Sequence, residues 1–363
     1  MYIIDAHEDF AYNALNFGRD YRLSAAQIRI AEKDGPIPSL NGQATLGYPD
    51  YQRGQVALIF GTIFTAHRRH IHGLAEKLVY TSFNEARREY DRQINYYRDL
   101  ADRAHEFFRL VTSRKDLTET LAPWEKPPTD PAAVHPPVGI LMSMEGAEGI
   151  ESLSELEAYW DKGLRAIGPV WAGGRWCGGT IEPGGFTPEG YALLETMAGL
   201  GYVLDISHMN TESACRALDV YEGTVIASHA NPRALLKDPP DERHLTDDAI
   251  RGLVERGGVM GIVPFNQFID CAWKEGDDRS RVRLSHVAAM IDHVCQLAGD
   301  PSHVALGSDF DGGFGWPSIP LEMDTIADLQ KLSPELASRG YSTPDIEAIF
   351  HGNWRRILEN SLP

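Results

Sequence analysis

The sequence has few cysteines and no long apolar run. Its 363 residues include four cysteines, without CxxC spacing or a dense disulfide framework: Cys177, Cys215, Cys271 and Cys295. Reduced thiols in a cytoplasmic protein are the simplest interpretation. No apolar run approaches the roughly 18 residues of a transmembrane helix, and residues 1–5 lack the basic and apolar regions of a signal peptide. The sequence therefore predicts a cytoplasmic location and no membrane partner.

Positive charge is also scarce. The chain has 34 Lys and Arg against 52 Asp and Glu, which gives a formal net charge of -18. A nucleic-acid partner is not expected, because phosphate binding needs a basic face. Hydrophobic residues make up 43% of the chain, enough for a large buried core. These features favour a globular protein whose partner is a small molecule.

Apolar runs of strand length recur along the chain and alternate with helix-like segments. Uninterrupted apolar runs are typical of buried parallel strands. Eight strands alternating with helices predict an α/β fold, a single (β/α)8 TIM-like barrel that occupies residues 1–363 as one domain. The expected strands are residues 2–5, 56–62, 138–146, 164–171, 203–208, 224–229, 257–265 and 304–309.

Three segments between these strands carry expectations of their own. Residues 83–110 have apolar side chains at helical spacing and predict one long amphipathic helix. The proline-rich residues 122–137 predict a loop. The cluster His67-Arg68-Arg69-His70 is interpreted as a solvated loop.

Two of the apolar runs end on histidine, at His208 and His229. In a closed parallel barrel, the carboxyl ends of the strands meet at one mouth, where the chemistry of such folds is carried out. Neutral imidazoles that lie side by side are good zinc ligands. The alternative is that the two histidines only cap strand ends through hydrogen bonds.

Other strand ends carry further candidate ligands. His7 and Asp9 are two residues apart at the end of the first strand, so their side chains share one face. Glu145 ends the third strand, where a carboxylate is costly to bury unless it is paired or bound to metal. With Asp309 at the end of the eighth strand, five strand ends carry ionisable residues, and together they favour a metal site at the carboxyl ends of the strands.

Five side-chain ligands exceed the three usual for one catalytic zinc, so two Zn²⁺ ions are expected. His7 and Asp9 are assigned to one ion, His208 and His229 to the other, and Glu145 to both as a bridge. A water or hydroxide between the metals would be the nucleophile. Asp309 ends the eighth strand and can pass that water's proton to the leaving nitrogen. The alternative for Asp309 is a buried aspartate that binds loop amides, which is the interpretation favoured for Asp311.

The sequence resembles the membrane (renal) dipeptidase family, a zinc-dependent branch of the amidohydrolase superfamily. The motifs that carry the resemblance span nearly the whole chain: DAHED, SMEG, GFTPEG, LDISH, ASH, GSDFDG and HGNWRRIL. The resemblance implies a TIM-like barrel, a binuclear zinc site and cleavage of dipeptides, often with a D-residue at the C-terminal position. It also implies a homodimer.

Carried over by motif, the resemblance implies the same five metal ligands and gives Asp309 the acid/base role. It adds Arg243, in the segment RHLTDD, as the group that binds the carboxylate of the substrate. Bidentate hydrogen bonding by arginine suits that task. From sequence alone, Arg243 would be an ordinary surface residue.

The chain departs from the family pattern after the fourth strand. Eukaryotic members have a histidine there that polarises the substrate carbonyl, whereas this chain has Trp171. An indole N–H can donate a hydrogen bond but carries no charge. A related metal-dependent amidohydrolase, acting on a lactam, a cyclic amide or an N-acyl amino acid, is therefore the nearest alternative function. A catalytically silent metal-binding barrel is the alternative from a different class.

Overall fold

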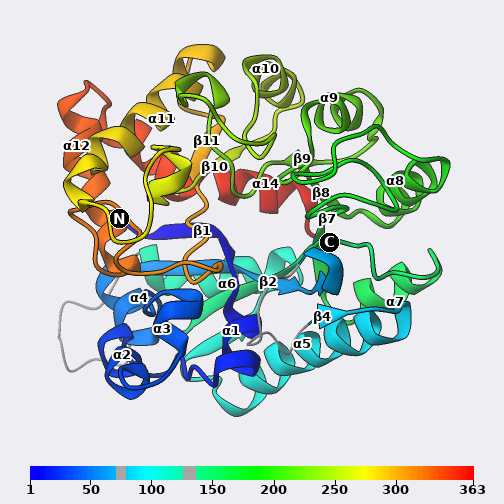
Figure 1. Ribbon diagram of the computed structural model, residues 1–363, viewed down its shortest axis with the longest axis horizontal. Helices are drawn as coiled ribbons and strands as arrows, with labels where there is room; N and C mark the ends of the chain where they lie inside the picture. The colour runs from blue at the N-terminus through cyan, green and yellow to red at the C-terminus, as the bar shows by residue number, and fades with distance from the viewer. Residues whose placement is uncertain (71–78, 126–135) are drawn as a thin grey trace.

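Eight parallel strands at the centre of the molecule form a nearly closed barrel (Figure 1). The computed structural model describes residues 1–70, 79–125 and 136–363 of the chain. Around the barrel the strands follow the order β10, β11, β1, β2, β6, β7, β8, β9. Each overlaps one of the eight predicted strands, which confirms the α/β barrel, although β7 to β11 are shorter than predicted and β1 and β2 are longer. The strands are β1 Ile3–Glu8, β2 Val56–Phe64, β6 Val138–Glu145, β7 Leu164–Gly168, β8 Val203–Asp205, β9 Val225–Ile226, β10 Met260–Ile262 and β11 Val304–Leu306.

The barrel closes between β9 and β10 through a single bridge. Ala227, just beyond β9, pairs with Met260 of β10 in parallel orientation. The Ala227 N–H donates to Val259 O at 3.0 Å, and Gly261 N–H donates to Ala227 O at 2.8 Å. These bonds bring the ends of β8 and β9 around to face the end of β1.

Every residue of the eight strands is buried. Strands covered on both faces read as continuous apolar runs, and this explains why the sequence pattern located them.

Helices follow the strands and surround the barrel, with α14 behind the strands in this view (Figure 1). Their bounds are α1 Phe10–Phe17, α2 Ala25–Glu32, α3 Ile37–Asn41, α4 Tyr48–Gly54, α5 Phe83–Arg103, α6 Arg114–Glu125, α7 Glu155–Asp161, α8 Pro188–Leu200, α9 Thr211–Val220, α10 Asp247–Glu255, α11 Leu284–Ala298, α12 Leu332–Ser338, α13 Thr343–Glu347 and α14 Asn353–Ser361. Shorter helical turns are η1 Arg68–His70, η2 Arg233–Leu235, η3 Asn266–Phe268, η4 Arg279–Arg281, η5 Ile326–Lys331 and η6 Ala348–Gly352. Among the described residues, no helix is long and apolar enough to cross a bilayer.

The single helix predicted for residues 83–110 is wrong at its end. Helix α5 stops at Arg103, and Phe108–Leu110 form strand β5, which pairs in parallel with Val138–Ile140 of β6. Strand β7 pairs with β6 only from Met142 onward, so the first residues of β6 have a free edge. Strand β5 occupies that edge and buries Phe108, which outweighs the helical spacing of the segment.

Two other expectations for loops need correction. Residues 122–125 of the predicted proline-rich loop continue helix α6, while residues 126–135 lie outside the described residues. The segment 67–70 is not a plain solvated loop. His67 belongs to the short strand β3 Ala66–His67, which pairs with β4 Val79–Tyr80, and a helical turn follows.

Candidate metal centre

The carboxyl ends of the barrel strands bring the predicted site residues together. His7 and Glu145 lie at the ends of β1 and β6, and Asp9 directly follows β1. His208 and Asp309 have left-handed backbone, with φ of 67° and 57°. Such conformations cost of order 1–3 kcal/mol in residues other than glycine and cluster at functional sites. Three site residues each lie three positions beyond a strand: His208 after β8, His229 after β9 and Asp309 after β11.

Glu145 stands between two groups of side chains, each of which could hold a metal ion. Its Oε2 lies 3.7 Å from His7 Nε2, and Asp9 completes this first group. Its Oε1 lies 2.6 Å from His208 Nε2 and 3.3 Å from His229 Nε2, which form the second. Within each group, the candidate ligand atoms lie within 4.8 Å of one another. One carboxylate therefore faces two ligand groups with different oxygens, which suits a pair of cations.

Asp309 belongs to a third overlapping group. Its Oδ1 lies 3.8 Å from His7 Nε2, and the two residues form a possible ligand cluster with His229. The side chain is buried and lines the same cavity as Glu145. Asp309 is therefore close enough to the candidate metal positions either to bind a cation or to exchange a proton with a group held there.

The electrostatics of the cluster favour a bound cation. Burial, and secondly the carboxylate of Glu145, raise the pKa of Asp9 well above its usual value. Burial and then Asp309 raise the pKa of Glu145 in the same direction. Burial, together with the Arg243 guanidinium, lowers the pKa of His7 to about 3, so its imidazole is neutral. Neutral imidazoles and crowded carboxylates form a donor set whose mutual repulsion a divalent cation would relieve.

Asp9 supplies an independent sign that a ligand belongs here. Its Oδ1 is buried and has no hydrogen-bond partner among the residues that the structure describes. A buried polar atom without a partner costs about 1–3 kcal/mol. A cation bound by Asp9 would satisfy this oxygen, and the residues present therefore fit a divalent metal.

Arg243 is buried beside this cluster, although nothing in its local sequence predicts burial. Only 2% of the residue is exposed. Its guanidinium lies 5.2 Å from the centroid of the Phe268 ring, and its three nitrogens have no hydrogen-bond partner among the described residues. A buried cation whose N–H groups have no hydrogen-bond acceptor is costly, so Arg243 is well placed to receive an anionic group of a ligand.

A cavity of about 310 Å³ connects these groups to solvent. Its lining includes the candidate ligands Asp9, Glu145 and His208, together with Asp309 and Arg243. Apolar and aromatic residues form much of the remaining wall, a pattern typical of small-molecule sites. Sequence reasoning missed these wall residues, because none has a distinctive local pattern: Tyr12, Leu40, Phe64, Ile181 and Phe268.

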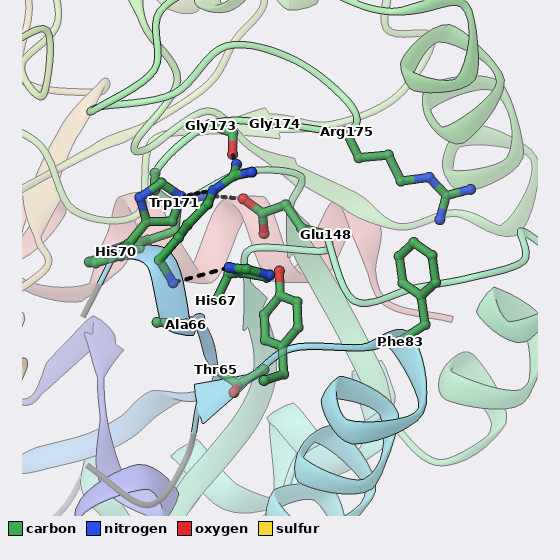
Figure 2. Close-up of a pocket in the computed structure, with 13 residues that line it drawn as sticks. Thr65, Ala66, His67, His70, Phe83, Glu148, Trp171, Gly173, Gly174 and Arg175 are labelled. Atoms are coloured by element: carbon green, nitrogen blue, oxygen red, sulfur yellow. Dashed lines mark hydrogen bonds between the residues drawn. The ribbon is translucent and has the colours of Figure 1, made fainter. Parts of the chain in front are cut away.

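Trp171 lines that cavity and also a second one of about 180 Å³ (Figure 2). Its indole packs edge-on against Phe64, with ring centroids 5.2 Å apart, and lies 6.2 Å from the ring of His208. Its backbone N–H donates to Glu148 Oε1 at 3.1 Å. Figure 2 shows Trp171, Glu148 and His70 around this second cavity. Trp171 is therefore the side chain that separates the candidate metal centre from this neighbouring space.

Asp311 has the structural role predicted for it. Its Oδ1 accepts the N–H and the hydroxyl of Thr45, at 2.8 and 2.7 Å. Its Oδ2 accepts the hydroxyl of Tyr21 at 2.8 Å and lies 2.8 Å from Arg19 Nη1. Both of its carboxylate oxygens therefore bind side chains and backbone of neighbouring segments.

Comparisons with known proteins agree on one family. A family model described as membrane dipeptidase (peptidase family M19) matches residues 1–361. The chain is 25% identical over 374 residues to the dipeptidase aclJ of Aspergillus oryzae, covering 98% of this chain and 77% of that protein. It is 30% identical over 233 residues to an uncharacterized protein in the pqqA 5′ region of Klebsiella pneumoniae, covering 61% and 82%.

A solved structure supports the fold over the full length. It is a metallopeptidase from Rhodobacter sphaeroides, liganded with a phosphinate mimic of the dipeptide L-Ala-D-Ala. The TM-score is 0.77 at 22% sequence identity, and the match covers 99% of both chains.

Proposed function

Because the chain belongs to the membrane dipeptidase family, peptidase family M19, we propose that it hydrolyses the peptide bond of small dipeptides with the help of two Zn²⁺ ions. The position of Glu145 is the observation that carries this proposal. Its two oxygens face two separate groups of neutral imidazole and carboxylate donors. The His, Asp and Glu donors are all ligand types that zinc accepts.

His7 and Asp9 would hold one ion, His208 and His229 the other, with Glu145 shared between them. Bound there, the two ions would supply Lewis acidity for the substrate carbonyl and lower the pKa of a shared water. Asp309 is proposed as the general base that accepts a proton from that water and returns it to the leaving nitrogen. Its carboxylate is buried in the same cavity, within 3.8 Å of His7 Nε2.

Arg243 is proposed to bind the C-terminal carboxylate of the dipeptide. Its unpaired guanidinium faces the cavity that holds Glu145 and Asp309, and a charge-assisted bidentate pair would satisfy it. Cleavage of dipeptides with a C-terminal D-residue is proposed as well. The family resemblance supports it, and the Rhodobacter sphaeroides relative was liganded with a mimic of L-Ala-D-Ala.

Trp171 supports a second candidate within the same chemistry. It lines the cavity of the candidate site at the position where the resemblance places a histidine in eukaryotic members, so the substrate carbonyl there would receive at most an indole N–H. Another small amide, namely a lactam, a cyclic amide or an N-acyl amino acid, is therefore the alternative substrate.

Further features of the prediction stay proposals. We treat residues 1–363 as one catalytic domain. The cytoplasmic location rests on the pattern of cysteine use, and the homodimer rests on the family resemblance.

The test is hydrolysis of a panel of L,L- and L,D-dipeptides by the zinc-loaded chain, beside a chelator-stripped sample and the same sample after zinc is restored. Zinc-dependent cleavage with two metals per chain would support the proposal. Two bound metals without cleavage of any dipeptide would favour another amide as substrate. Absence of both metal binding and cleavage would favour the silent barrel.

A further inference from the structure

The motifs that supply the candidate ligands His208 and His229 contain three polar residues with no role so far. Asp205 and Ser207 belong to LDISH, and Ser228 belongs to ASH. All three are buried, and Ser207 and Ser228 directly precede the candidate ligands His208 and His229. Buried polar side chains this close to a reactive centre call for an account of what they hold.

Their hydrogen bonds form a chain that ends on the ring of His229. Asp205 Oδ1 accepts the backbone N–H groups of Ser207 and Ser228, at 3.0 and 2.9 Å. Asp205 Oδ2 is hydrogen-bonded to the Ser228 hydroxyl. Ser228 Oγ in turn lies 2.7 Å from His229 Nδ1. The backbone of His229 is fixed separately, because its N–H donates to Ser207 Oγ at 3.1 Å.

The donor and acceptor roles along this chain follow from chemistry. A carboxylate oxygen only accepts, so the single hydroxyl proton of Ser228 is donated to Asp205. Ser228 Oγ can then only accept from His229, and the proton of that imidazole must sit on Nδ1. The lone pair of His229 is consequently on Nε2, the atom that lies 3.3 Å from Glu145 Oε1.

We propose that Asp205 and Ser228 are positioning residues for His229: through the Ser228 hydroxyl they fix its tautomer and ring orientation, so that Nε2 presents its lone pair to the metal. This inference rests on the proposed function, since it assigns a role toward the second Zn²⁺ ion. Such outer partners of a ligating histidine are known to change metal affinity by about 10–100-fold.

The neighbouring imidazole is held in a similar way. Thr180 Oγ1 lies 3.1 Å from His208 Nδ1 and 3.3 Å from the His208 carbonyl oxygen, to which its hydroxyl donates. The hydroxyl oxygen of Thr180 is then the acceptor for Nδ1–H. Nε2 of His208, which lies 2.6 Å from Glu145 Oε1, carries the lone pair. Both imidazoles of the second group thus turn the same nitrogen toward Glu145.

The chain also contains a matched control. On the other side of the barrel, Asp5 of β1 accepts the backbone N–H of Ser308 at 2.6 Å and is hydrogen-bonded to the Ser308 hydroxyl. Ser308 Oγ accepts the N–H of Phe310 at 3.2 Å and has no recorded contact with an imidazole among the described residues. Ser308→Ala therefore removes an equally buried aspartate–serine bond without touching a candidate ligand ring.

The experiment measures zinc affinity of the full-length chain by competition with a chromophoric chelator, for wild type, Ser228→Ala, Asp205→Asn and Ser308→Ala. We expect Ser228→Ala and Asp205→Asn to weaken one of two zinc sites by about 10–100-fold, and Ser308→Ala to leave both sites near their wild-type affinity. Wild-type affinities in Ser228→Ala, or an equal loss in Ser308→Ala, would overturn the proposal.

A second readout is made on wild-type protein and needs one variant, His229→Gln, only to assign the signals. ¹⁵N NMR of the zinc-loaded chain, with the His229 signals identified by their loss in His229→Gln, reports which ring nitrogen carries the proton. A protonated Nδ1 supports the proposal, and a metal-bound Nδ1 overturns it. Because neither readout uses turnover, a chain that binds zinc as expected but cleaves no dipeptide would overturn only the proposed function.

Discussion

The strand pairs β1–β11 and β8–β9 carry opposite halves of the candidate centre, and each pair is joined by an aspartate–serine hydrogen bond. Asp5 is bonded to Ser308 between β1 and the residues after β11, and Asp205 is bonded to Ser228 between β8 and the residues after β9. In the first pair, the serine oxygen accepts a backbone N–H. In the second, it accepts from the ring of His229.

The comparison separates two tasks that the same bond can perform. Between β1 and β11 it joins the first strand to the residues that follow β11, and among the described residues its serine oxygen contacts only backbone beyond Asp5. Between β8 and β9 it also fixes the tautomer of one imidazole. The difference comes from the residue after the serine, which is Asp309 in one case and His229 in the other. The aspartate–serine hydrogen bond therefore acts on a candidate metal ligand only where a histidine follows the serine.

Removing the residue that joins the two halves has the largest expected effect. Glu145→Ala takes one ligand from each group and should lower kcat/KM by about 10⁴-fold or more, because metal stabilisation of the transition state is worth several kcal/mol. Metal analysis should find fewer than two zinc ions per chain. Glu148→Gln, on the same strand-end loop but outside both groups, is the control. Two zinc ions and near-normal turnover in Glu145→Ala would contradict the shared-ligand role.

A change on the β11 side should separate catalysis from metal binding. Asp309→Asn keeps the shape of the side chain but cannot act as a base, so turnover should fall by about 10³-fold while two zinc ions remain bound. Steady-state kinetics and metal analysis of the same sample make the test. Loss of a zinc ion would instead assign Asp309 to the third ligand group, with His7 and His229.

Arg243 tests which end of the substrate the cavity recognises. Arg243→Met should reduce kcat/KM for a dipeptide by about 10²-fold, because a hydrogen bond to a charged group contributes about 1.5–3 kcal/mol. The matched control is the corresponding dipeptide amide, which lacks the terminal carboxylate. Wild type should already have a low kcat/KM for the amide, and Arg243→Met should lower that value little further. An equal loss on both substrates would place Arg243 elsewhere in the reaction.

The apoprotein of the same variant should gain stability. The three guanidinium nitrogens of Arg243 are buried without hydrogen-bond partners among the described residues. Burial outweighs the attraction of the Asp309 and Glu145 carboxylates and lowers the pKa of Arg243, so removing this charge relieves a net desolvation cost. Thermal unfolding should show a higher Tm for Arg243→Met than for wild type in the absence of zinc and substrate. A lower Tm would indicate that the guanidinium has a stabilising partner.

The last prediction concerns stability rather than activity, at Glu148 beside Trp171. Burial raises the pKa of Glu148 to about 7 from a usual 4.5. The folded chain therefore binds a proton that the unfolded chain releases between these values, and stability should fall as pH rises from about 4.5 to about 7. Glu148→Gln should remove up to roughly 3 kcal/mol of this fall. Chemical denaturation of both proteins at pH 5 and pH 8 measures the free energy of unfolding. The same loss of stability between these pH values in Glu148→Gln and in wild type would contradict the raised pKa.

Much of the fold and of the centre follows from local sequence. Continuous apolar runs located all eight barrel strands, because strands covered on both faces need such runs. A polar residue at the end of an apolar run was expected at the barrel mouth. His7 and Glu145 lie at strand ends, and His208, His229 and Asp309 lie three residues beyond them. The end of α5 could not be predicted this way, because residues 108–110 form a strand by pairing with residues 138–140 of β6, which lie about thirty positions later in the sequence.

Tertiary structure alone decided which groups face one another. The residues around Arg243 in the sequence do not predict that its side chain is buried. Its guanidinium is covered by residues distant in the sequence, such as Phe268. Asp205 and Ser228 stand in visible motifs, yet only the adjacency of β8 and β9 shows that they are bonded. The sequence determines which residues end each strand, since burial patterns are local. Partners across strands depend on the register and closure of the barrel, which are properties of the whole chain.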